Sequence, residues 1–426
     1  MSSSEKKIAI IGLGYVGLPL AIEFAKKYQV LGFDIDETRV LELRDNKDKT
    51  KEADLDMLSR LLNNEPIGLK LSSDEELLRE YNIFIVTVPT PVDASKAPDL
   101  KPLLRATKML GKVLSKGAIV IYESTVYPGC TEEDCVPVLE QYSGLKYNTD
   151  FYCGYSPERI NPGDKINTLT KIKKVTSGST PLIAQQIDDL YAEIITAGTH
   201  LAPSIKVAEA SKAIENAQRD VNISFVNELA LIFDRMGIDT MDVLAAAATK
   251  WNFLNYKPGL VGGHCIGVDP YYLAYKSNAL GYHPQVLLSG RKVNENMGIF
   301  IANKVVKLII ANGGKVKNDN VLILGFTFKE NCPDIRNTRV IDIYKELEQF
   351  GLKLDVYDPW ANADEVKLEY NIQLESDLPN KTYGAIIVAV AHNEFLALDY
   401  KNYKDRGAVI FDIKSFIHRD LVDARL

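Results

Sequence analysis

A Gly-x-Gly-x-x-Gly sequence at residues 12–17 constrains the fold of this chain more than any other feature. An apolar run at residues 8–11 precedes it, a helical pattern of apolar residues follows, and a second apolar run at residues 30–33 ends at Asp34. This succession of strand, glycine loop, helix, strand and acidic residue predicts a βαβ unit that binds a dinucleotide, because the glycines let a pyrophosphate approach the helix N-terminus.

The acidic residue after the second run indicates which dinucleotide is bound. Asp34 would hold the ribose hydroxyls and repel the 2′-phosphate of NADP, so the sequence predicts NAD, although Arg39 nearby tempers that preference. Thr90 follows another predicted strand, at residues 83–88, in a loop that could line the cofactor. Thr125 lies just after a further strand, where a hydroxyl either faces the ligand crevice or serves in ordinary turn chemistry. The predicted cofactor-binding residues of this region are Gly12, Gly14, Tyr15, Val16, Gly17, Asp34, Arg39, Thr90 and Thr125.

Further apolar runs predict the rest of an N-terminal domain, residues 1–203. Strands are expected at residues 118–122 and 151–155, and two shorter β-like segments, at residues 174–177 and 192–196, are expected on either side of a helix. This pattern is typical of a parallel sheet covered by helices.

The pattern changes at residue 204, where one long helix is predicted to reach residue 237 without proline or glycine. Lys212 and Asn216 lie one turn apart on it, so they can reach one ligand together. A solvated lysine is the ordinary interpretation of Lys212, but its alanine and serine neighbours favour a packed, functional face. So much apolar helix surface predicts a central domain, residues 204–315, that also pairs subunits.

A second boundary is marked by two glycines and a polar stretch, and residues 316–426 predict another parallel α/β sheet. The loop at residues 325–329, after the first strand of that sheet, lacks the three-glycine pattern, so this domain is expected to bind a nucleotide differently. The predicted fold class is therefore α/β, with two Rossmann-like parallel-sheet domains joined by a long central helix. The strands expected in the second sheet are residues 321–324, 352–357, 385–390 and 408–411.

A cysteine lies between glycines and a carboxylate in the sequence Gly-Gly-His-Cys-Ile-Gly-Val-Asp-Pro at residues 262–270. The glycines permit a tight turn and a close approach to a ligand. Cys265 is then either a nucleophile, with Asp269 four residues beyond it, or a buried structural thiol. His264 has no partner at metal-ligand spacing, so no metal site is predicted.

Composition narrows the classes of function. A net charge of −7 argues against nucleic-acid binding, and no apolar run approaches the roughly 18 residues of a membrane span. The first residues lack the apolar core of a signal peptide. Five cysteines without metal-ligand spacing fit reduced thiols, so a cytoplasmic location is expected.

A series of short motifs lies along the whole chain: Gly-Tyr-Val-Gly at 14–17, Glu-Ser-Thr at 123–125, Ser-Pro-Glu-Arg at 156–159, Lys212 with Asn216, Gly-Gly-His-Cys at 262–265 and Gly-Phe-Thr-Phe-Lys at 325–329. Together they resemble those of the nucleotide-sugar 6-dehydrogenases, the UDP-glucose/GDP-mannose dehydrogenase family. The resemblance implies a UDP-sugar substrate, a homodimer or higher homo-oligomer, and oxidation of the sugar 6-hydroxymethyl to a carboxylate with two NAD⁺. The aldehyde would be trapped on the cysteine as a thiohemiacetal, oxidised to a thioester and released by water.

The resemblance also implies catalytic roles. Lys212 and Asp269 would transfer protons and stabilise the developing oxyanion. Glu158 and Thr125 would position or activate the hydrolytic water, and Asn216 would contact the sugar or that water. The implied catalytic residues are Cys265, Lys212, Asp269, Glu158, Thr125 and Asn216.

Two further residues are implied in ligand binding. Lys329 would reach the substrate from the second sheet, and Arg336 would meet the NAD pyrophosphate, where a guanidinium fits two phosphate oxygens. The implied substrate-binding residues are Glu158, Arg159, Lys212, Asn216, Phe253, Tyr256, Lys257, Gly262 and Lys329.

The segment before the cysteine, residues 251–260, resembles the branch that acts on UDP-N-acetylhexosamines. An arginine of the UDP-glucose branch is replaced by Thr-Lys-Trp at residues 249–251, and a further acid by Asn-Pro-Gly at residues 161–163. We therefore expect UDP-N-acetylglucosamine or UDP-N-acetylgalactosamine to be oxidised to the uronic acid for surface polysaccharide biosynthesis. UDP-glucose is the alternative substrate.

Two other functions remain possible on the sequence. A two-electron dehydrogenase of the hydroxyacid or 6-phosphogluconate kind shares the Rossmann and helical parts but needs neither the cysteine nor the second sheet. A non-catalytic NAD-sensing protein would bind NAD without turning over any UDP-sugar.

Overall fold

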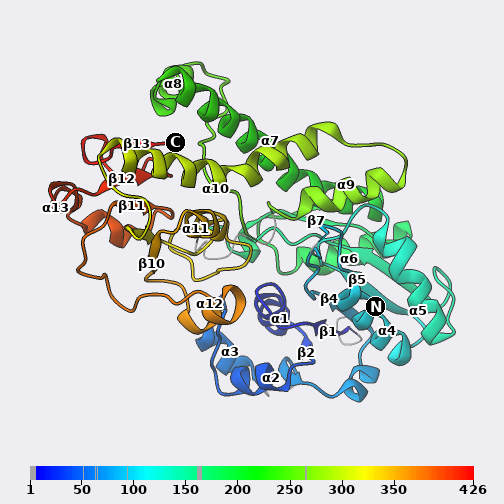
Figure 1. The fold of residues 1–426 in the computed structure, drawn as a ribbon. Coiled ribbons are helices and arrows are strands. Elements are labelled where there is room, and N and C mark those ends of the chain that lie inside the picture. The colour runs from blue at the N-terminus through cyan, green and yellow to red at the C-terminus, as the bar shows by residue number, and fades with distance from the viewer. Residues whose placement is uncertain are drawn as a thin grey trace. The chain divides into compact units, whose positions relative to one another are not determined.

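The computed structural model describes residues 6–50, 52–62, 64, 66–93, 95–160, 166–263 and 266–426 (Figure 1). His264, Cys265 and the Asn-Pro-Gly sequence at residues 161–163 therefore lie outside the described residues. The chain divides into a first compact unit, Met1–Glu215 with Tyr271–Tyr282, and a second, Asn216–Pro270 with His283–Leu426. The three domains expected from the sequence, with boundaries after residues 203 and 315, stay a prediction.

The first unit is built on a six-stranded sheet whose neighbouring strands are all parallel. Its order, β3-β2-β1-β4-β5-β6, is that of a dinucleotide-binding Rossmann sheet, and the order reverses between β1 and β4. The α/β class predicted from the glycine loop is confirmed. The strands are β1 (Lys7–Ile11), β2 (Gln29–Phe33), β3 (Gly68–Ser72), β4 (Ile83–Val86), β5 (Ala118–Tyr122) and β6 (Phe151–Tyr155), with a separate parallel pair β7 (Lys174–Thr176) and β8 (Thr199–Leu201).

The central strands of this sheet are buried on both faces, so they form continuous apolar runs rather than alternating ones. One face packs Ile10, Ile85 and Ile121 against helices α1 and α6. Helix α6 begins where the Thr180 hydroxyl accepts the amide of Ile183, an ordinary N-cap. The helices of this part of the chain are α1 (Gly17–Ala25), α2 (Glu37–Arg44), α3 (Leu55–Leu61), α4 (Lys101–Val113), α5 (Val136–Ser143) and α6 (Pro181–Ala192).

The strand predicted at residues 192–196 is wrong. Residue 192 ends α6, and the amides of Ile194 and Ile195 bond back to the carbonyl oxygen of Tyr191. Both isoleucines are buried in the same core as α6, so their apolar, β-branched side chains extend a helix face into its final turn. The partner of β7 is β8, a few residues further on.

Two helices contain residues of both compact units. Helix α7 (Ile205–Met236) is 32 residues long, which confirms the long central helix to within one residue at each end (Figure 1). Helix α9 (Asp269–Ala279) starts at Asp269. Within the described ranges, no helix combines the length and hydropathy that a membrane crossing requires.

The second unit contains a five-stranded parallel sheet of order β10-β9-β11-β12-β13. Counted along its own strands this is 2-1-3-4-5, a doubly wound order that differs from the first sheet and reverses between β9 and β11. Helices α10, α11 and α12 bury one face of it, and Tyr383, Phe395 and Tyr400 help to bury the other. The elements are α8 (Thr240–Ala247), α10 (Gln285–Ala311), β9 (Asn320–Leu324), α11 (Val340–Gln349), β10 (Lys353–Tyr357), α12 (Ala363–Tyr370), β11 (Ala385–Val388), α13 (Tyr400–Asp405), β12 (Val409–Asp412) and β13 (Ala424–Arg425).

Candidate active site

The glycine loop lies at the carboxyl end of β1, beside the point where the strand order reverses. Gly12 has a φ of +97°, which favours glycine. A Cβ at Gly17 would lie 1.8 Å from the carbonyl oxygen of Gly12 and 2.5 Å from Oγ1 of Thr87, so no larger residue fits. A Cβ at Gly14 would meet nothing within 4 Å, which leaves space above the N-terminus of α1. This cradle fits a pyrophosphate group, as the sequence predicts.

The carboxylate of Asp34 braces this loop from the end of β2. Its Oδ2 accepts the amide of Leu13 at 2.8 Å, and its Oδ1 accepts the amide of Asp36 at 3.0 Å. The side chain is only partly buried. An acid held beside the glycine loop is placed as the ribose-binding acid of an NAD site would be.

Arg39 supports the same loop from within the protein. Its Nε donates to the carbonyl oxygen of Leu13 at 3.0 Å, and a terminal nitrogen donates to Asp48 at 2.7 Å. Burial would raise the pKa of Asp48, but the bonds from Arg39 and Thr50 outweigh it and lower that pKa. The guanidinium is thus already engaged, so we assign Arg39 a bracing function beside its predicted contact with the cofactor.

The loops after β4 and β5 are tied together by hydroxyl groups. Thr90 Oγ1 donates to the carbonyl oxygen of Thr125 at 2.6 Å, and Ser124 Oγ donates to that of Val88 at 2.6 Å. The hydroxyl of Tyr272, on α9, donates to the carbonyl oxygen of Thr90 at 2.8 Å. Thr125 itself stays half-buried, at the carboxyl end of a parallel strand. Such an end is where ligands bind in sheets of this kind.

Glu158 is buried after β6 and is held by partners that the sequence did not reveal. Lys174, on β7, places its Nζ 2.8 Å from Oε2 of Glu158 and 2.8 Å from Oε2 of Glu123. Two signals of this contact were present in the sequence: Lys174 is the first residue of a buried strand, and Glu123 directly follows another. Arg159 instead pairs with Glu215 on α7.

Glu209, on the first turns of α7, holds the loop that follows Thr125. Its two carboxylate oxygens accept the amides of Gly129 at 2.5 Å and Thr131 at 2.9 Å. The side chain is fully buried, and burial, partly offset by these bonds, raises the pKa of Glu209 to about 7. Sequence reasoning did not identify this residue, because its partners lie some 80 positions earlier in the chain.

Further along α7, two predicted catalytic residues are brought together. Asn216 Nδ2 donates to Oδ2 of Asp269 at 2.5 Å, and both side chains are buried. Lys212, one turn earlier on α7, is 7% exposed, which favours the packed face over a solvated lysine.

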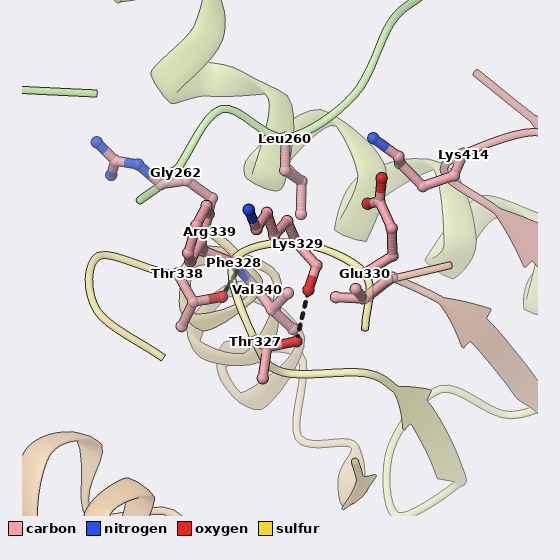
Figure 2. Close-up of a pocket in the computed structure, with 12 residues that line it drawn as sticks. Leu260, Gly262, Thr327, Phe328, Lys329, Glu330, Thr338, Arg339, Val340 and Lys414 are labelled. Carbon is pink, nitrogen blue, oxygen red and sulfur yellow. Dashed lines mark hydrogen bonds between the residues drawn. The ribbon is translucent and has the colours of Figure 1, made fainter. Parts of the chain in front are cut away.

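In the second unit an open pocket, whose free space is about 320 Å³ with adjoining solvent included, lies at the carboxyl ends of β9, β11 and β12. Figure 2 shows Lys329, from the loop after β9, and Lys414, from the loop after β12, together with Leu260 and Gly262 of the segment before the cysteine. Lysines at the carboxyl ends of parallel strands, beside the point where the strand order reverses, suit an anionic nucleotide. Lys414 was not predicted.

The glycines before the cysteine fit closely against this pocket. A Cβ at Gly262 would lie 2.5 Å from the carbonyl oxygen of Asn337. Gly263 has a φ of +83°, and its Cβ would lie 2.7 Å from the ring of Phe328. A residue with a Cβ therefore fits at neither position, while the turn expected here continues into residues 264 and 265, outside the described residues.

A buried polar cluster holds the loop after β9. Oδ2 of Asp358 accepts the amides of Phe326 at 2.6 Å and Thr327 at 2.9 Å and lies 3.1 Å from Nε2 of His392. The amide of Asn331 donates to Nδ1 of His392, so the ring proton is on Nε2. Thr327 then bonds the carbonyl oxygen of Lys329 (Figure 2).

Four residues predicted to bind NAD or the sugar are not part of the contacts described so far. Arg336 directs its guanidinium to Asp334, with bonds of 2.9 and 2.6 Å. Phe253 and Tyr256 are partly buried and Lys257 is exposed; none of the three lines the pocket of Figure 2. Their assignment to the substrate stays a prediction, as does that of Arg336 to NAD.

Four of the five cysteines lie among the described residues. Among the described residues Cys130, Cys135, Cys153 and Cys332 are buried, and no group of three histidine, cysteine or acidic side chains is placed to hold a metal ion. The role of Cys265 and the cytoplasmic location stay predictions.

Models of the UDP-glucose/GDP-mannose dehydrogenase family match the chain in three successive parts. The NAD binding domain model matches residues 6–195, the central domain model matches residues 206–296, and the UDP binding domain model matches residues 322–419. The glycine loop falls in the first match and the pocket of Figure 2 falls mainly in the third.

Individual relatives match over almost the full length. A UDP-N-acetyl-D-glucosamine 6-dehydrogenase of Pseudomonas aeruginosa is 55% identical over 425 residues, which are 99% of this chain and 100% of that one. Protein CapL of Staphylococcus aureus is 50% identical over 418 residues, 98% of this chain and 97% of its own. The solved structure of a UDP-D-ManNAc dehydrogenase from Pyrococcus horikoshii has a TM-score of 0.88 at 28% identity and covers 98% of both chains.

Proposed function

This chain belongs to the UDP-glucose/GDP-mannose dehydrogenase family, and we propose that it oxidises C6 of a UDP-N-acetylhexosamine to the carboxylate, with UDP-N-acetylglucosamine as the preferred substrate. It is an NAD-dependent oxidoreductase of the nucleotide-sugar dehydrogenases. The 55% identity to an enzyme named for UDP-N-acetyl-D-glucosamine supports the acetamido sugar over glucose. Use of the product in surface polysaccharide synthesis stays an expectation from the resemblance.

The first half of the reaction removes one hydride and traps the product. The C6 hydroxyl gives its proton to a base, C6 gives a hydride to NAD⁺, and an aldehyde results. The thiolate of Cys265 adds to the aldehyde carbon, which forms a thiohemiacetal. Lys212 and Asp269 serve proton transfer and stabilise the oxyanion, and the bond from Asn216 keeps Asp269 oriented.

The second half releases the acid. In the second oxidation the thiohemiacetal hydroxyl gives its proton to the base and its carbon gives a hydride, for which a second NAD⁺ held at the glycine loop and Asp34 would be the acceptor, so that a thioester remains. Water then attacks the acyl carbon, the carbon–sulfur bond breaks, and Cys265 leaves as the thiolate. Glu158 accepts the proton of the water, and Thr125 helps to position that water.

The observation that supports this proposal is a pair of different candidate ligand sites, each beside a point where the strand order reverses. The first has the glycine cradle and Asp34, which suit NAD. The second has Lys329 and Lys414 around a pocket that Leu260 and Gly262 also line. The segment that reaches this second pocket leads directly into Cys265. A two-electron hydroxyacid dehydrogenase has no use for the second site.

The deciding experiment measures NADH formed per sugar consumed for UDP-N-acetylglucosamine, UDP-N-acetylgalactosamine and UDP-glucose in parallel. We expect two NADH per sugar and the highest kcat/KM with UDP-N-acetylglucosamine. Faster turnover of UDP-glucose than of both acetamido sugars would refute the substrate, and one NADH per sugar would refute the four-electron reaction.

A Cys265→Ala variant tests the covalent step against the hydroxyacid alternative. We expect it to form no acid, because without the thiolate neither the thiohemiacetal nor the thioester exists. Full conversion to the acid by this variant would favour the alternative. A Cys332→Ala variant, at a buried cysteine of the second unit, serves as the matched control for the loss of a thiol.

We also propose that the chain forms a homodimer or a higher homo-oligomer through α7. Large apolar side chains remain exposed on this helix at intervals that keep them on one stripe. Exposed apolar side chains along one face of a long helix are typical of a surface that a second subunit covers. The residues of the stripe are Val207, Ile214, Phe225, Ile232 and Met236.

A further inference from the structure

A buried lysine joins two carboxylates of the first unit. Lys174 is 2% exposed, and its Nζ lies 2.8 Å from one oxygen each of Glu158 and Glu123. Burial opposes the charged form of a lysine, but the two carboxylates outweigh it and raise the pKa of Lys174. A buried ammonium therefore persists here because both partners are present.

The carboxylate of Glu158 is fixed by several donors. Its Oε1 accepts the amides of Arg159 and Ile160, each at 2.6 Å, and its Oε2 accepts Nζ of Lys174. An ionised carboxylate offers about four acceptor positions, so the donors among the described residues leave one position on Oε2. Burial would raise the pKa of Glu158, but Lys174 and the two amides hold it below its ordinary value of 4.5.

Glu123 is the carboxyl of this cluster that takes up a proton more readily. Its Oε2 accepts Nζ of Lys174, and its Oε1 accepts the hydroxyl of Tyr191 on α6. Burial raises the pKa of Glu123, and although Lys174 opposes this, the charge of Glu158 adds to it. One ammonium faces two carboxylates, so a proton on Glu123 leaves Glu158 ionised and paired.

The ammonium of Lys174 is held from a further side by Tyr191. It lies 5.4 Å from the centre of the Tyr191 ring, within the range of a cation–π contact. Arg159, the residue after Glu158, directs its guanidinium to Glu215 and to the backbone carbonyl oxygen of Lys173. Among the residues that the structure describes, Lys174 is thus the cation whose contact sets the state of the Glu158 carboxylate.

We propose that Lys174 is a positioning residue for thioester hydrolysis: it keeps Glu158 oriented to accept the proton of the attacking water, while Glu123 and Tyr191 hold Lys174 in place. This inference rests on the proposed function, because it requires a thioester on Cys265. In the step, the water oxygen bonds to the acyl carbon, sulfur leaves as the thiolate, and the proton passes to the remaining position on Glu158 Oε2.

The direct test is Lys174→Met, which keeps the length of the side chain and removes its charge. On rapid mixing with NAD⁺ and UDP-N-acetylglucosamine, we expect a burst of two NADH per active site, followed by turnover at least ~100-fold slower than in the wild type. Intact mass should show the acyl group on the protein during the slow phase. Lys173→Met, at the exposed neighbour, should keep wild-type kinetics.

The pH dependence separates this role from a merely structural one. In Lys174→Met the acid limb of the kcat profile should move to higher pH, because Glu158 loses its cation. In Glu123→Gln it should move to lower pH, because the remaining carboxylate no longer shares Lys174. Lys174→Arg, which restores the charge, should recover part of kcat. If Lys174→Met does not fold, the shift in Glu123→Gln decides alone.

Three results would overturn the inference: wild-type turnover in Lys174→Met, slow turnover without a burst, or an acid limb that moves in neither variant. The wild-type protein separates this failure from that of the proposed function. Fewer than two NADH per sugar and no acyl adduct with the wild type would refute the four-electron reaction, and the inference with it. Two NADH per sugar in the wild type with no burst in the variant would refute only the role of Lys174.

Discussion

Replacing Asp358 by asparagine should loosen the loop that carries Lys329. Oδ2 of Asp358 accepts two backbone amides and contacts His392, and its Oδ1 accepts the amides of Trp360 and Ala361. Asparagine has one acceptor oxygen and one NH₂ group. Whichever way its amide points, at least two backbone donors face another donor.

The magnitude follows from these bonds. Each buried amide left without an acceptor costs about 1–3 kcal/mol, so the Asp358→Asn variant should lose roughly 2–6 kcal/mol of unfolding free energy at neutral pH. Burial acts against ionisation, but the bonds from His392 and the two amides lower the pKa of Asp358 from 3.8 to about 2. The ionised group therefore contributes roughly 2.5 kcal/mol above pH 4. That contribution is lost as the pH falls from 3.8 through about 2.

Urea unfolding at neutral pH and at about pH 3, together with initial rates of NADH formation, would test this reasoning. We expect the stability difference between wild type and Asp358→Asn to narrow at the lower pH. The KM for the UDP-sugar should rise, while the KM for NAD⁺ changes little, because the cluster supports only the loop of the second sheet. Asp364→Asn, on the exposed first turn of α12, is the control. Unchanged stability at neutral pH, or an equal rise in both KM values, would refute the argument.

Gly17→Ala should weaken NAD binding about tenfold or more and also lower the unfolding temperature, because a Cβ at residue 17 collides with the protein. Gly14→Ala should weaken NAD binding without lowering the unfolding temperature, because a Cβ at residue 14 collides with nothing in the protein. Calorimetry with and without NAD⁺ distinguishes the two variants. Burial raises the pKa of Glu209 from 4.5 to about 7. The protonated side chain therefore contributes roughly 3 kcal/mol to the unfolding free energy at acid pH, and this contribution should be lost as the pH rises from 4.5 through 7. Denaturation across this pH range should show the loss of stability in the wild type and not in Glu209→Gln. Phe225→Asp, in the middle of the exposed stripe on α7, should reduce the molar mass in light scattering to that of one chain, while Glu228→Gln should not.

The parts of the fold that follow from local pattern were predictable. Buried parallel strands are continuous apolar runs, so β5 and β6 were located to the residue, and the period of α7 gave both of its ends closely. The segment at residues 192–196 has the composition of a strand, but the core beside α6 takes its isoleucines into a helical turn. Local pattern cannot separate these outcomes, because packing decides between them.

The candidate site was predictable where one short segment contains the chemistry. The glycine loop with Asp34 and the spacing of Lys212 and Asn216 are of this kind. Lys174 and Asp358 were not found, because each depends on partners that only the folded sheet brings near. A charged residue beside an apolar strand signals a buried partner, but the sequence does not identify that partner.

The pairing of β1 has a consequence for how the chain is made. Ile8 lies opposite Ile83, so the six-stranded sheet cannot close until a segment 75 residues further on has left the ribosome. At about 5–20 residues per second this takes roughly 4–15 s, during which one apolar edge of β1 has no strand beside it. We therefore expect nascent chains of this length to need a chaperone that shields exposed strands. Their release into solution should occur only after β4 has been synthesised.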